Sequence, residues 1–418
     1  MSKHSIAVAI FIILFTFSCQ KKEEAPLLAH HLPEKEEEVT PIDSSLITIP
    51  FSLALHPVSE DYAFEKSRAV SEFYGKKIGL SDFSGGLLVA KNGKIIFEDY
   101  KGYANYAKKT AVSKSTPLHL ASVSKVMTAT LVLKLVQENK IDLNEKVQTY
   151  LPDFPYQNTT VKTLLNHRSG LPHYSRFSES VKGWNSRKIL TNADVLDYLK
   201  RYKFALLSKN DTHFNYCNTN YAILALVIEQ VTGMTYAEAM QEQIFKPLGM
   251  NDSFVFDFVN QKNEVSQSYK TNYVNHGWDQ YDAIYGDKNI YSTPRDLVKF
   301  DLATYSTEFL RKDLWEEALK GYSYEKRGVK NYGLGIRLRE WETGQTLHYH
   351  NGWWHGNTSS YTTLKNDTIV IIALSNKYTR KTYQAMKLSA LFGDYPFESQ
   401  NKFYERCRGH CSKRNSNF

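Results

Sequence analysis

The run of residues from Leu120 to Leu135 constrains the fold of this chain more than any other feature of its sequence. It reads Leu-Ala-Ser-Val-Ser-Lys-Val-Met-Thr-Ala-Thr-Leu-Val-Leu-Lys-Leu, which is long and apolar enough for a buried helix. Ser122 and Lys125 stand three residues apart at its head, and residues at that spacing share one helix face. The run therefore predicts a buried helix that begins with a hydroxyl and an amine side by side.

A neutral amine within hydrogen-bond reach of a serine is one established way to make that serine a nucleophile. The pattern Ser-x-x-Lys occurs four times in the chain, at Ser18, Ser122, Ser323 and Ser399. Only the copy at Ser122 opens a long apolar helix. We therefore predict Ser122 as a nucleophile and Lys125 as the group that activates it.

The overall composition narrows the classes of function. The 418 residues include 52 Lys and Arg against 44 Asp and Glu. The resulting net charge of +8 is small for this length, and the sequence has no dense run of basic residues. Nucleic acid is therefore not an expected partner. The chain has no Gly-x-Ser-x-Gly, His-Glu-x-x-His, Walker or Gly-x-Gly-x-x-Gly motif, and Cys407, His410 and Cys411 are one ligand short of a structural zinc site. We expect no cofactor and no metal.

Residues 1–18 have the pattern of a secretory signal peptide. Lys3 precedes an apolar run from Ile6 to Phe17 that is too short to span a bilayer as a mature helix. The sequence Phe-Thr-Phe-Ser-Cys that ends at Cys19 resembles a bacterial lipobox, which predicts lipidation of Cys19 and a lipid-anchored place in the cell envelope. An ordinary signal peptide followed by an unrelated cysteine is the alternative.

The rest of the chain divides by composition. Residues 19–61 carry Lys-Lys-Glu-Glu, Glu-Lys-Glu-Glu-Glu and scattered prolines without apolar periodicity, which is typical of a flexible tether. Residues 62–395 are predicted to form the folded domain. Residues 396–418 are predicted to be a basic tail.

Strand patterns stand at both ends of the folded part, and helical patterns stand between them. Residues 86–90 and 94–98 flank Asn92-Gly93, a strong hairpin signal, and residues 346–350, 359–364 and 368–375 also have strand patterns. Helices are predicted over 221–231 and 236–245 and from Thr293-Pro294 onward. The predicted fold class is α/β (α+β): an antiparallel sheet of N- and C-terminal strands flanked by helices, with a large helical insertion.

Two further stretches offer groups that a serine nucleophile needs. Tyr216 and Asn218 place a phenol and an amide directly before an apolar helix. His350-Asn351-Gly352-Trp353 follows a predicted strand and combines an imidazole with a glycine, which lets a backbone approach a ligand closely.

Together these motifs resemble the serine β-lactamase-related hydrolases, in the branch of class C β-lactamases and D-Ala-D-Ala peptidases that also includes esterases. Ser-x-x-Lys is a signature of that wider group. The stretches 163–172, 286–297 and 332–335 fit the family pattern in the expected order, and the similarity runs from about Phe83 to Lys377.

The resemblance implies a role for each residue of these motifs. Ser122 would be the acylated nucleophile, Lys125 its activating partner and Tyr216 the proton relay. Asn218 would orient the substrate and Lys125, and His350-Asn351-Gly352 would replace the Lys-Thr-Gly strand of the family. The backbone N–H groups of Ser122 and Trp353 would form the oxyanion hole.

The resemblance also implies a reaction, which is hydrolysis of an amide or ester through an acyl-enzyme. A small-molecule or peptide substrate is expected: a D-amino-acid peptide derived from peptidoglycan, a small ester or a β-lactam, in that order. The β-lactam comes last because the imidazole of His350 is not the fixed positive charge that a lysine gives. The alternative is a catalytically silent lipoprotein that binds peptidoglycan or a protein partner.

Overall fold

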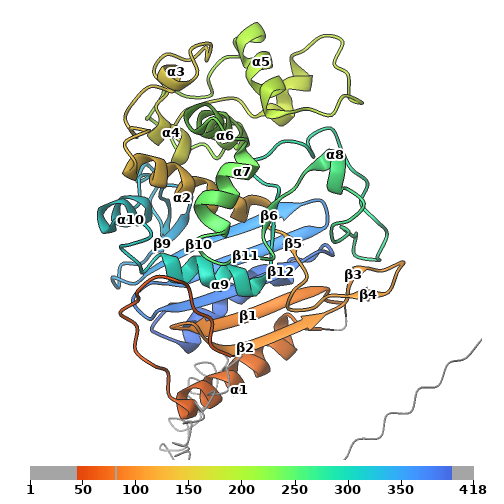
Figure 1. Cartoon of the computed structure of the whole chain (residues 1–418), viewed down its shortest axis with the longest axis vertical. Helices are drawn as coiled ribbons and strands as arrows, with labels where there is room; N and C mark the ends of the chain where they lie inside the picture. The colour runs from red at the N-terminus through yellow and green to blue at the C-terminus, as the bar shows by residue number, and fades with distance from the viewer. Residues whose placement is uncertain (1–44, 81, 398–418) are drawn as a thin grey trace, which may run out of the picture. The chain divides into compact units, whose positions relative to one another are not determined.

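A seven-stranded antiparallel sheet joins the two ends of the folded chain. A computed structural model describes residues 45–80 and 82–397. The strand order is β2-β1-β12-β11-β10-β9-β8, so the N-terminal hairpin lies beside the C-terminal strands (Figure 1). The strands are β1 Gly85–Lys91, β2 Lys94–Lys101, β8 Lys330–Tyr332, β9 Arg337–Glu340, β10 Thr346–Trp354, β11 Asn357–Leu364 and β12 Ile369–Ser375.

The β1–β2 hairpin and the interior strand β12 form for the local reasons that the sequence predicts. Asn92 and Gly93 adopt φ values of 50° and 81°, as the tight turn between two twisted strands requires. All residues of β12 are buried, because β1 and β11 pair with its two edges and side chains cover both of its faces. The predicted fold class is confirmed.

Helices cover both faces of this sheet. Leu88, Ala90 and Leu374 face the helical insertion, whereas Leu87 and Val89 belong to a second core with α1 and η4, as the two-residue period of a strand requires. Figure 1 shows α1 beside β1 and β2, away from the helices of the insertion. The helices are α1 Glu60–Lys77, η1 Ala121–Val123, α2 Ser124–Gln137, α3 Val147–Tyr150, α4 Val161–Leu165, η2 Tyr174–Glu179, α5 Asn192–Tyr202, α6 Asn218–Thr232, α7 Tyr236–Met240, η3 Gln241–Phe245, α8 Phe258–Gln261, α9 Pro294–Ala303, α10 Lys312–Leu319 and η4 Lys381–Leu391.

The insertion is not wholly helical, which the sequence did not predict. Leu118–His119 (β5), Ile290–Ser292 (β7) and Phe254–Val255 (β6) form a three-stranded sheet in the order β5-β7-β6. β3 (Tyr103–Asn105) pairs with β4 (Thr110–Ala111). Because β5 leads directly into η1 and α2, the small sheet fixes the start of the predicted catalytic helix.

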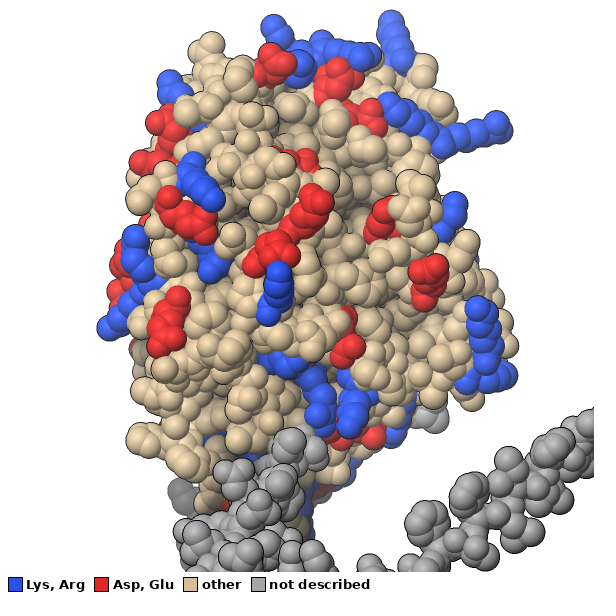
Figure 2. Space-filling view, in the orientation of Figure 1, with Lys and Arg blue, Asp and Glu red and all other residues tan. Residues whose placement is uncertain are grey.

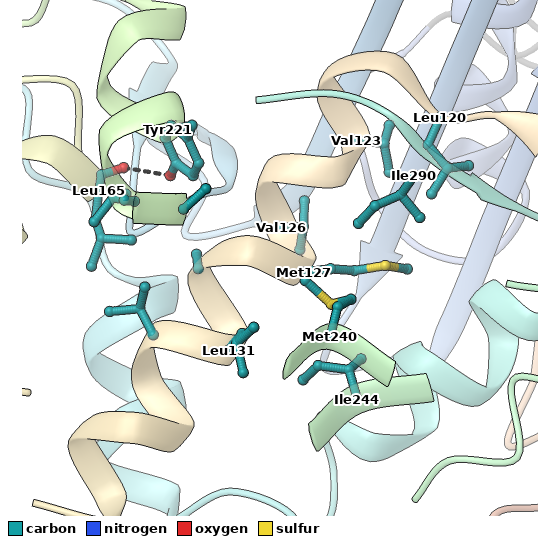
Figure 3. Close-up of a cluster of buried hydrophobic side chains, with 14 of the residues drawn as sticks. Leu120, Val123, Val126, Met127, Leu131, Leu165, Tyr221, Met240, Ile244 and Ile290 are labelled. Carbon is teal, nitrogen blue, oxygen red and sulfur yellow. Dashed lines mark hydrogen bonds between the residues drawn. The ribbon is translucent and has the colours of Figure 1, made fainter. Parts of the chain in front are cut away.

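α2 lies in the middle of the larger core. Figure 3 shows its side chains Val126, Met127 and Leu131 among residues of the surrounding elements. Met240 of α7 and Ile290 of β7 belong to the same buried cluster. The Tyr221 hydroxyl of α6 donates to the Leu165 carbonyl at 2.7 Å, and this bond ties α6 to α4 (Figure 3). The predicted burial of this run is therefore correct.

The predicted tether extends too far toward the domain. Ile47 is buried, and its N–H donates to the Gly93 carbonyl at 2.9 Å. Phe51 packs edge-on against Phe309 with ring centroids 5.6 Å apart. The alternation of apolar residues at 47, 49, 51, 53 and 55 is the signal for this packing. The folded part thus begins by residue 46 and not at 62.

The C-terminal boundary also moves outward, so that the domain is longer at this end too. Phe397 packs against Trp341 with ring centroids 5.6 Å apart, so the domain continues past residue 395. The predicted signal peptide with Cys19, the rest of the tether and the tail from residue 398 lie outside the described residues. Within 45–80 and 82–397, no helix combines the length and apolar character that crossing a membrane requires.

Charged side chains of both signs are interspersed over most of the face in Figure 2. Many of them form exposed ion pairs, such as Lys200 with Asp153 and Arg311 with Asp313. Pairs of this kind contribute little to stability, so the two apolar cores hold the fold together.

Candidate active site

Ser122 and Lys125 meet at the start of α2. Ser122 lies in the short helix η1 and is half-buried, whereas Lys125 in the first turn of α2 is fully buried. The Lys125 Nζ lies 3.0 Å from the Ser122 Oγ and donates to the Asp287 carbonyl at 2.7 Å. The hydroxyl thus stands between a buried amine and solvent, as proton transfer from serine to lysine requires.

The backbone just before Ser122 is held in an unusual conformation. Ala121 has φ 47°, in the left-handed region that a residue with a Cβ seldom adopts. Its N–H donates to His119 Nδ1 at 3.0 Å, and His119 Nε2 donates to Asn289 Oδ1 at 3.1 Å. Asn289 in turn donates to the carbonyls of Asp282 and Ile284 at 2.6 and 2.9 Å. A buried chain of hydrogen bonds therefore fixes the turn that carries the nucleophile.

His119 must be neutral for this chain to exist. Burial lowers the pKa of its imidazole to about 4, and the bond to Asn289 opposes that shift. Because Nδ1 accepts from Ala121, the single proton of the neutral ring sits on Nε2. Sequence reasoning missed His119 and Asn289, since their meeting depends on the pairing of β5 with β7.

Gly352 brings strand β10 against the nucleophile turn. A Cβ at this position would lie 2.4 Å from the Leu120 carbonyl oxygen, 2.9 Å from the Ser122 nitrogen and 2.2 Å from the Ser359 Oγ. Only glycine permits that approach. Trp353 follows directly and is 63% exposed. The strand and the turn thus bring together the two predicted oxyanion-hole residues, and their role stays a prediction.

Tyr216 also lies near the Lys125 amine, just before α6. Its ring centroid is 5.1 Å from the Lys125 Nζ. His167 holds it there, because the His167 ring packs at 4.3 Å and its Nδ1 accepts from the Cys217 N–H at 3.2 Å. The structure therefore brings Tyr216 together with the Ser122–Lys125 pair, and its relay role stays a prediction.

Asn218 begins α6 and offers a free acceptor. Its N–H donates to His173 Nε2 at 3.3 Å. Its Oδ1 is buried and accepts no hydrogen bond from any described residue. A buried amide oxygen without a donor is costly, so a substrate N–H or a water is its natural partner.

His350 of β10 lies near Tyr216, with ring centroids 6.2 Å apart. Its side chain is fully buried. Nδ1 donates to the Asn351 carbonyl at 2.9 Å, so Nε2 accepts from the Tyr332 hydroxyl at 3.1 Å. Burial first, and then the positive charges of Arg337 and Lys125, hold its pKa well below the ordinary value. His350 is thus a neutral group that orients Tyr332, and its part in substrate binding stays a prediction.

Arg337 supplies the cation that His350 cannot. Its guanidinium lies 4.7 Å from the centroid of the Tyr216 ring and 5.5 Å from that of Tyr332. Sequence reasoning missed Arg337, which stands between the buried residues Ile336 and Leu338 at the start of β9. A fixed positive charge therefore does stand beside the predicted relay phenol.

Asp287 holds the Lys125 amine through its backbone carbonyl. Its carboxylate accepts from the Tyr174 hydroxyl at 2.8 Å, and that hydroxyl accepts from the Lys288 Nζ at 2.9 Å. All three side chains are buried. The carbonyl that receives the Lys125 amine is therefore anchored by a charged network, which sequence reasoning also missed.

One group of side chains near the end of β10 has metal-ligand chemistry. Asp279, Asp282 and His355 place one ligand atom each within 4.8 Å of one another. Asp282 already accepts from Trp354 Nε1 at 2.7 Å and from His355 Nε2 at 2.9 Å. These bonds give the cluster an evident structural role, since they fasten the turn between β10 and β11.

A pocket of about 560 Å³ is lined in part by Tyr332 and Arg337, which both lie against the Tyr216 ring. Phe214, Tyr332 and Arg337 line the end of the pocket nearest Tyr216, and the loop around residues 325–330 lines the rest. The volume is in the range of small-molecule sites.

The comparisons with known proteins agree with this geometry. The family model described as Beta-lactamase matches residues 79–391. The chain belongs to the beta-lactamase family. It is 31% identical over 334 residues to penicillin-binding protein 4* of Bacillus subtilis, covering 74% of this chain and 73% of that protein. As a member of this family, the chain is a serine hydrolase.

Other family members differ in what they act on. The chain is 27% identical to teichoic acid D-alanine hydrolase of Staphylococcus aureus, covering 79% of this chain and 78% of that protein. The crystal structure of a penicillin-binding protein from Bacillus halodurans matches with a TM-score of 0.66 at 22% identity, over 81% of this chain and all of that one. The last likeness concerns the fold alone.

Proposed function

We propose that this beta-lactamase family enzyme hydrolyses D-amino-acyl esters or amides of the cell envelope through an acyl-enzyme on Ser122. The observation that carries the proposal is the 3.0 Å contact between Ser122 Oγ and the fully buried Lys125 amine. The name of one relative, teichoic acid D-alanine hydrolase, supports a D-alanyl substrate.

The proposed reaction has two steps. Ser122 Oγ attacks the substrate carbonyl while its proton passes to Lys125, and the backbone N–H groups of Ser122 and Trp353 bind the oxyanion. The tetrahedral intermediate expels an alcohol or amine, which receives a proton through Tyr216. Water then attacks the acyl-enzyme, releases the acid and returns the proton to Ser122. One water is consumed in each cycle.

The position of Arg337 supports a role for its side chain in binding an anionic group of the substrate. Its guanidinium lies over the Tyr216 ring and is therefore close to the atoms that react. A carboxylate next to the scissile bond, as in a D-Ala-D-Ala peptide or a β-lactam, would pair with it. This cation makes β-lactam hydrolysis a second candidate function.

Labelling of Ser122 tests the central proposal. A fluorophosphonate probe should form an adduct on Ser122, detectable by mass spectrometry, and the adduct should vanish in Ser122→Ala. A D-alanyl ester, its L-alanyl counterpart, a D-Ala-D-Ala peptide and a cephalosporin then test the substrate. We expect hydrolysis of the D-alanyl ester in preference to the L-form. Absence of any adduct on folded protein would refute the proposal.

Substitution of Arg337 tests the anion-binding role. Arg337→Gln should raise KM about tenfold or more for the D-Ala-D-Ala peptide, because a charge-assisted bond is lost. An ester without a carboxylate should show little change. Equal effects on both substrates would contradict the role.

Attachment to a membrane through lipidated Cys19 is part of the proposal. The sequence that ends at Cys19 supports it, as does a substrate located in the envelope. Cys19→Ala should release the protein from membranes, as fractionation would measure, and full retention of that variant would contradict lipid anchoring there.

A further inference from the structure

Four fixed positive charges line the pocket beside Tyr216. They are Lys326, Arg327, Lys330 and Arg337, and the acid Glu325 is the only other fixed charge among the lining residues. Glu325 is already paired with Arg168, which also binds Asp211. Within residues 45–80 and 82–397, none of the four cations has a carboxylate within ion-pair distance. The pocket therefore carries an uncompensated positive charge.

This arrangement differs from that of other cations around the fold. Lys162 pairs with Glu317 and Arg295 pairs with Glu98. Like charges around one concave surface repel one another and create a positive potential in the hollow. A bound anion would remove that repulsion, and it would be drawn toward the site before contact.

The positions of the cations indicate more than one charge on the ligand. Arg337 stands at the inner end over Tyr216, whereas Lys326, Arg327 and Lys330 belong to the segment between α10 and β9. A single carboxylate next to the scissile bond would need only Arg337. The three remaining cations have no part in the proposed reaction, and the pocket of about 560 Å³ has room for a longer group.

We propose that Lys326, Arg327 and Lys330 form a subsite for a phosphodiester chain that carries the acyl group. The inference rests on the proposed function, because it assigns the non-reacting part of the same substrate. Each unit of such a chain bears one negative charge, and phosphate oxygens match guanidinium and ammonium donors well. Successive phosphates can thus meet successive cations while the ester reaches Ser122.

Binding of an unacylated chain tests the subsite without catalysis. Full-length Ser122→Ala protein is titrated with poly(glycerol phosphate) at low and at physiological salt. We expect binding that weakens with salt, because the three side chains are exposed and screened. Replacing Lys326, Arg327 and Lys330 together by Ala should weaken binding about tenfold or more.

A second triple variant controls for total charge. Arg68, Lys76 and Lys77 are exposed on α1, and their joint replacement by Ala removes the same one Arg and two Lys. This variant should bind poly(glycerol phosphate) as the parent does. Equal weakening in both triple variants would overturn the subsite, and so would binding of poly-L-glutamate as tight as that of the phosphate chain.

The rate of ester hydrolysis distinguishes failure of the subsite from failure of the proposed function. With Ser122 present, the triple variant at 326, 327 and 330 should cleave a short D-alanyl ester that lacks phosphate and carboxylate groups at the parental rate. If the parent cleaves no such ester, the proposed function fails while the binding result still stands. If cleavage is normal and poly(glycerol phosphate) does not bind, only the subsite fails.

Discussion

At the scale of single residues, the position of the nucleophile depends on buried side chains outside the Ser122, Lys125 and Tyr216 set. The left-handed Ala121 keeps its conformation because its N–H has an acceptor in His119, and His119 is held by Asn289. Strained backbone at a reacting group persists only when its surroundings determine it in this way. His119 is therefore a positioning residue for Ser122.

Substitution of His119 should slow acylation more than it affects folding. His119→Phe removes the acceptor for the Ala121 N–H, and a small displacement of a reacting group can reduce the rate about 100-fold. His119→Asn keeps an acceptor oxygen near the position of Nδ1 and should recover much of the rate. The measurement is the rate of fluorophosphonate labelling at Ser122, set against Tm. Equal rates for Phe and Asn would show that the bond to Ala121 is irrelevant.

Tyr216 differs from His119, because its hydroxyl does not hold any other described part of the structure in place. That hydroxyl makes no hydrogen bond to any described residue, whereas the ring packs against His167. Tyr216→Phe should thus leave Tm unchanged and lower kcat by about 100-fold or more, the range for loss of a general acid or base. Steady-state kinetics with the D-alanyl ester and a melting curve check both parts. An unchanged kcat would exclude the relay role.

At the scale of elements, the site is a junction between η1 and β10. Ser359 donates to the Leu120 carbonyl at 2.5 Å, and Gly352 allows the strand to lie against the Ser122 nitrogen. The catalytic turn thus gains its position from the sheet as well as from its own helix.

Gly352→Ala should separate these two elements. The new Cβ would clash with backbone atoms at Leu120 and Ser122, so the turn must shift. We expect Ser122 labelling to fall about 100-fold. Gly75→Ala in α1 is the matched control, because nothing lies within 4 Å of its Cβ and Ala favours a helix. Normal labelling of Gly352→Ala would mean that β10 does not position Ser122.

Elements with a strong local pattern could be predicted from the sequence. The Asn92-Gly93 hairpin, the buried strand β12 and the helix that starts after Thr293 have their causes within a few residues. β5, β6 and β7 could not, because strands of two or three residues are too short to show a period.

In the candidate site, too, contacts within a local motif could be predicted and contacts between distant segments could not. Ser122 and Lys125 are neighbours in sequence, so a motif contains their geometry. His119 with Asn289 and Arg337 with Tyr216 are partners only through strand pairing and helix packing, which no local pattern records. The environment of His350 could not be predicted for this reason, since Tyr332 on a different strand determines it.

At the scale of the whole molecule, four buried histidines and the half-buried His173 make stability depend on pH. Burial lowers the pKa of His119, His173 and His348 to about 4. Burial and nearby cations hold the pKa of His167 and His350 well below the ordinary value. Each of these side chains is neutral in the folded protein at pH 7.

The sign of the dependence follows from the order of the two pKa values. In the unfolded chain a histidine titrates near pH 6.5, so between about 6.5 and 4 the unfolded state binds more protons than the folded state. The stabilisation is complete above pH 6.5 and is lost as the pH falls toward 4. For His119, His173 and His348, a shift of this size corresponds to about 3 kcal/mol each. Burial raises the pKa of Glu317, but its bonds to Lys162, Lys320 and Tyr322 outweigh burial and lower the pKa to about 2. The stability that Glu317 contributes is therefore lost mainly at a lower pH than that of the histidines.

His348 is suited to test this because it lies away from the nucleophile, where its Nε2 donates to the Leu319 carbonyl at 2.9 Å. His348→Gln keeps a donor and cannot titrate, so the free energy of unfolding should fall less steeply between pH 6.5 and 4. His213→Gln, at an exposed position, is the matched control and should leave the slope unchanged. Urea unfolding at several pH values measures both slopes. A slope that His348→Gln does not reduce would show that burial of this imidazole is not a source of acid sensitivity.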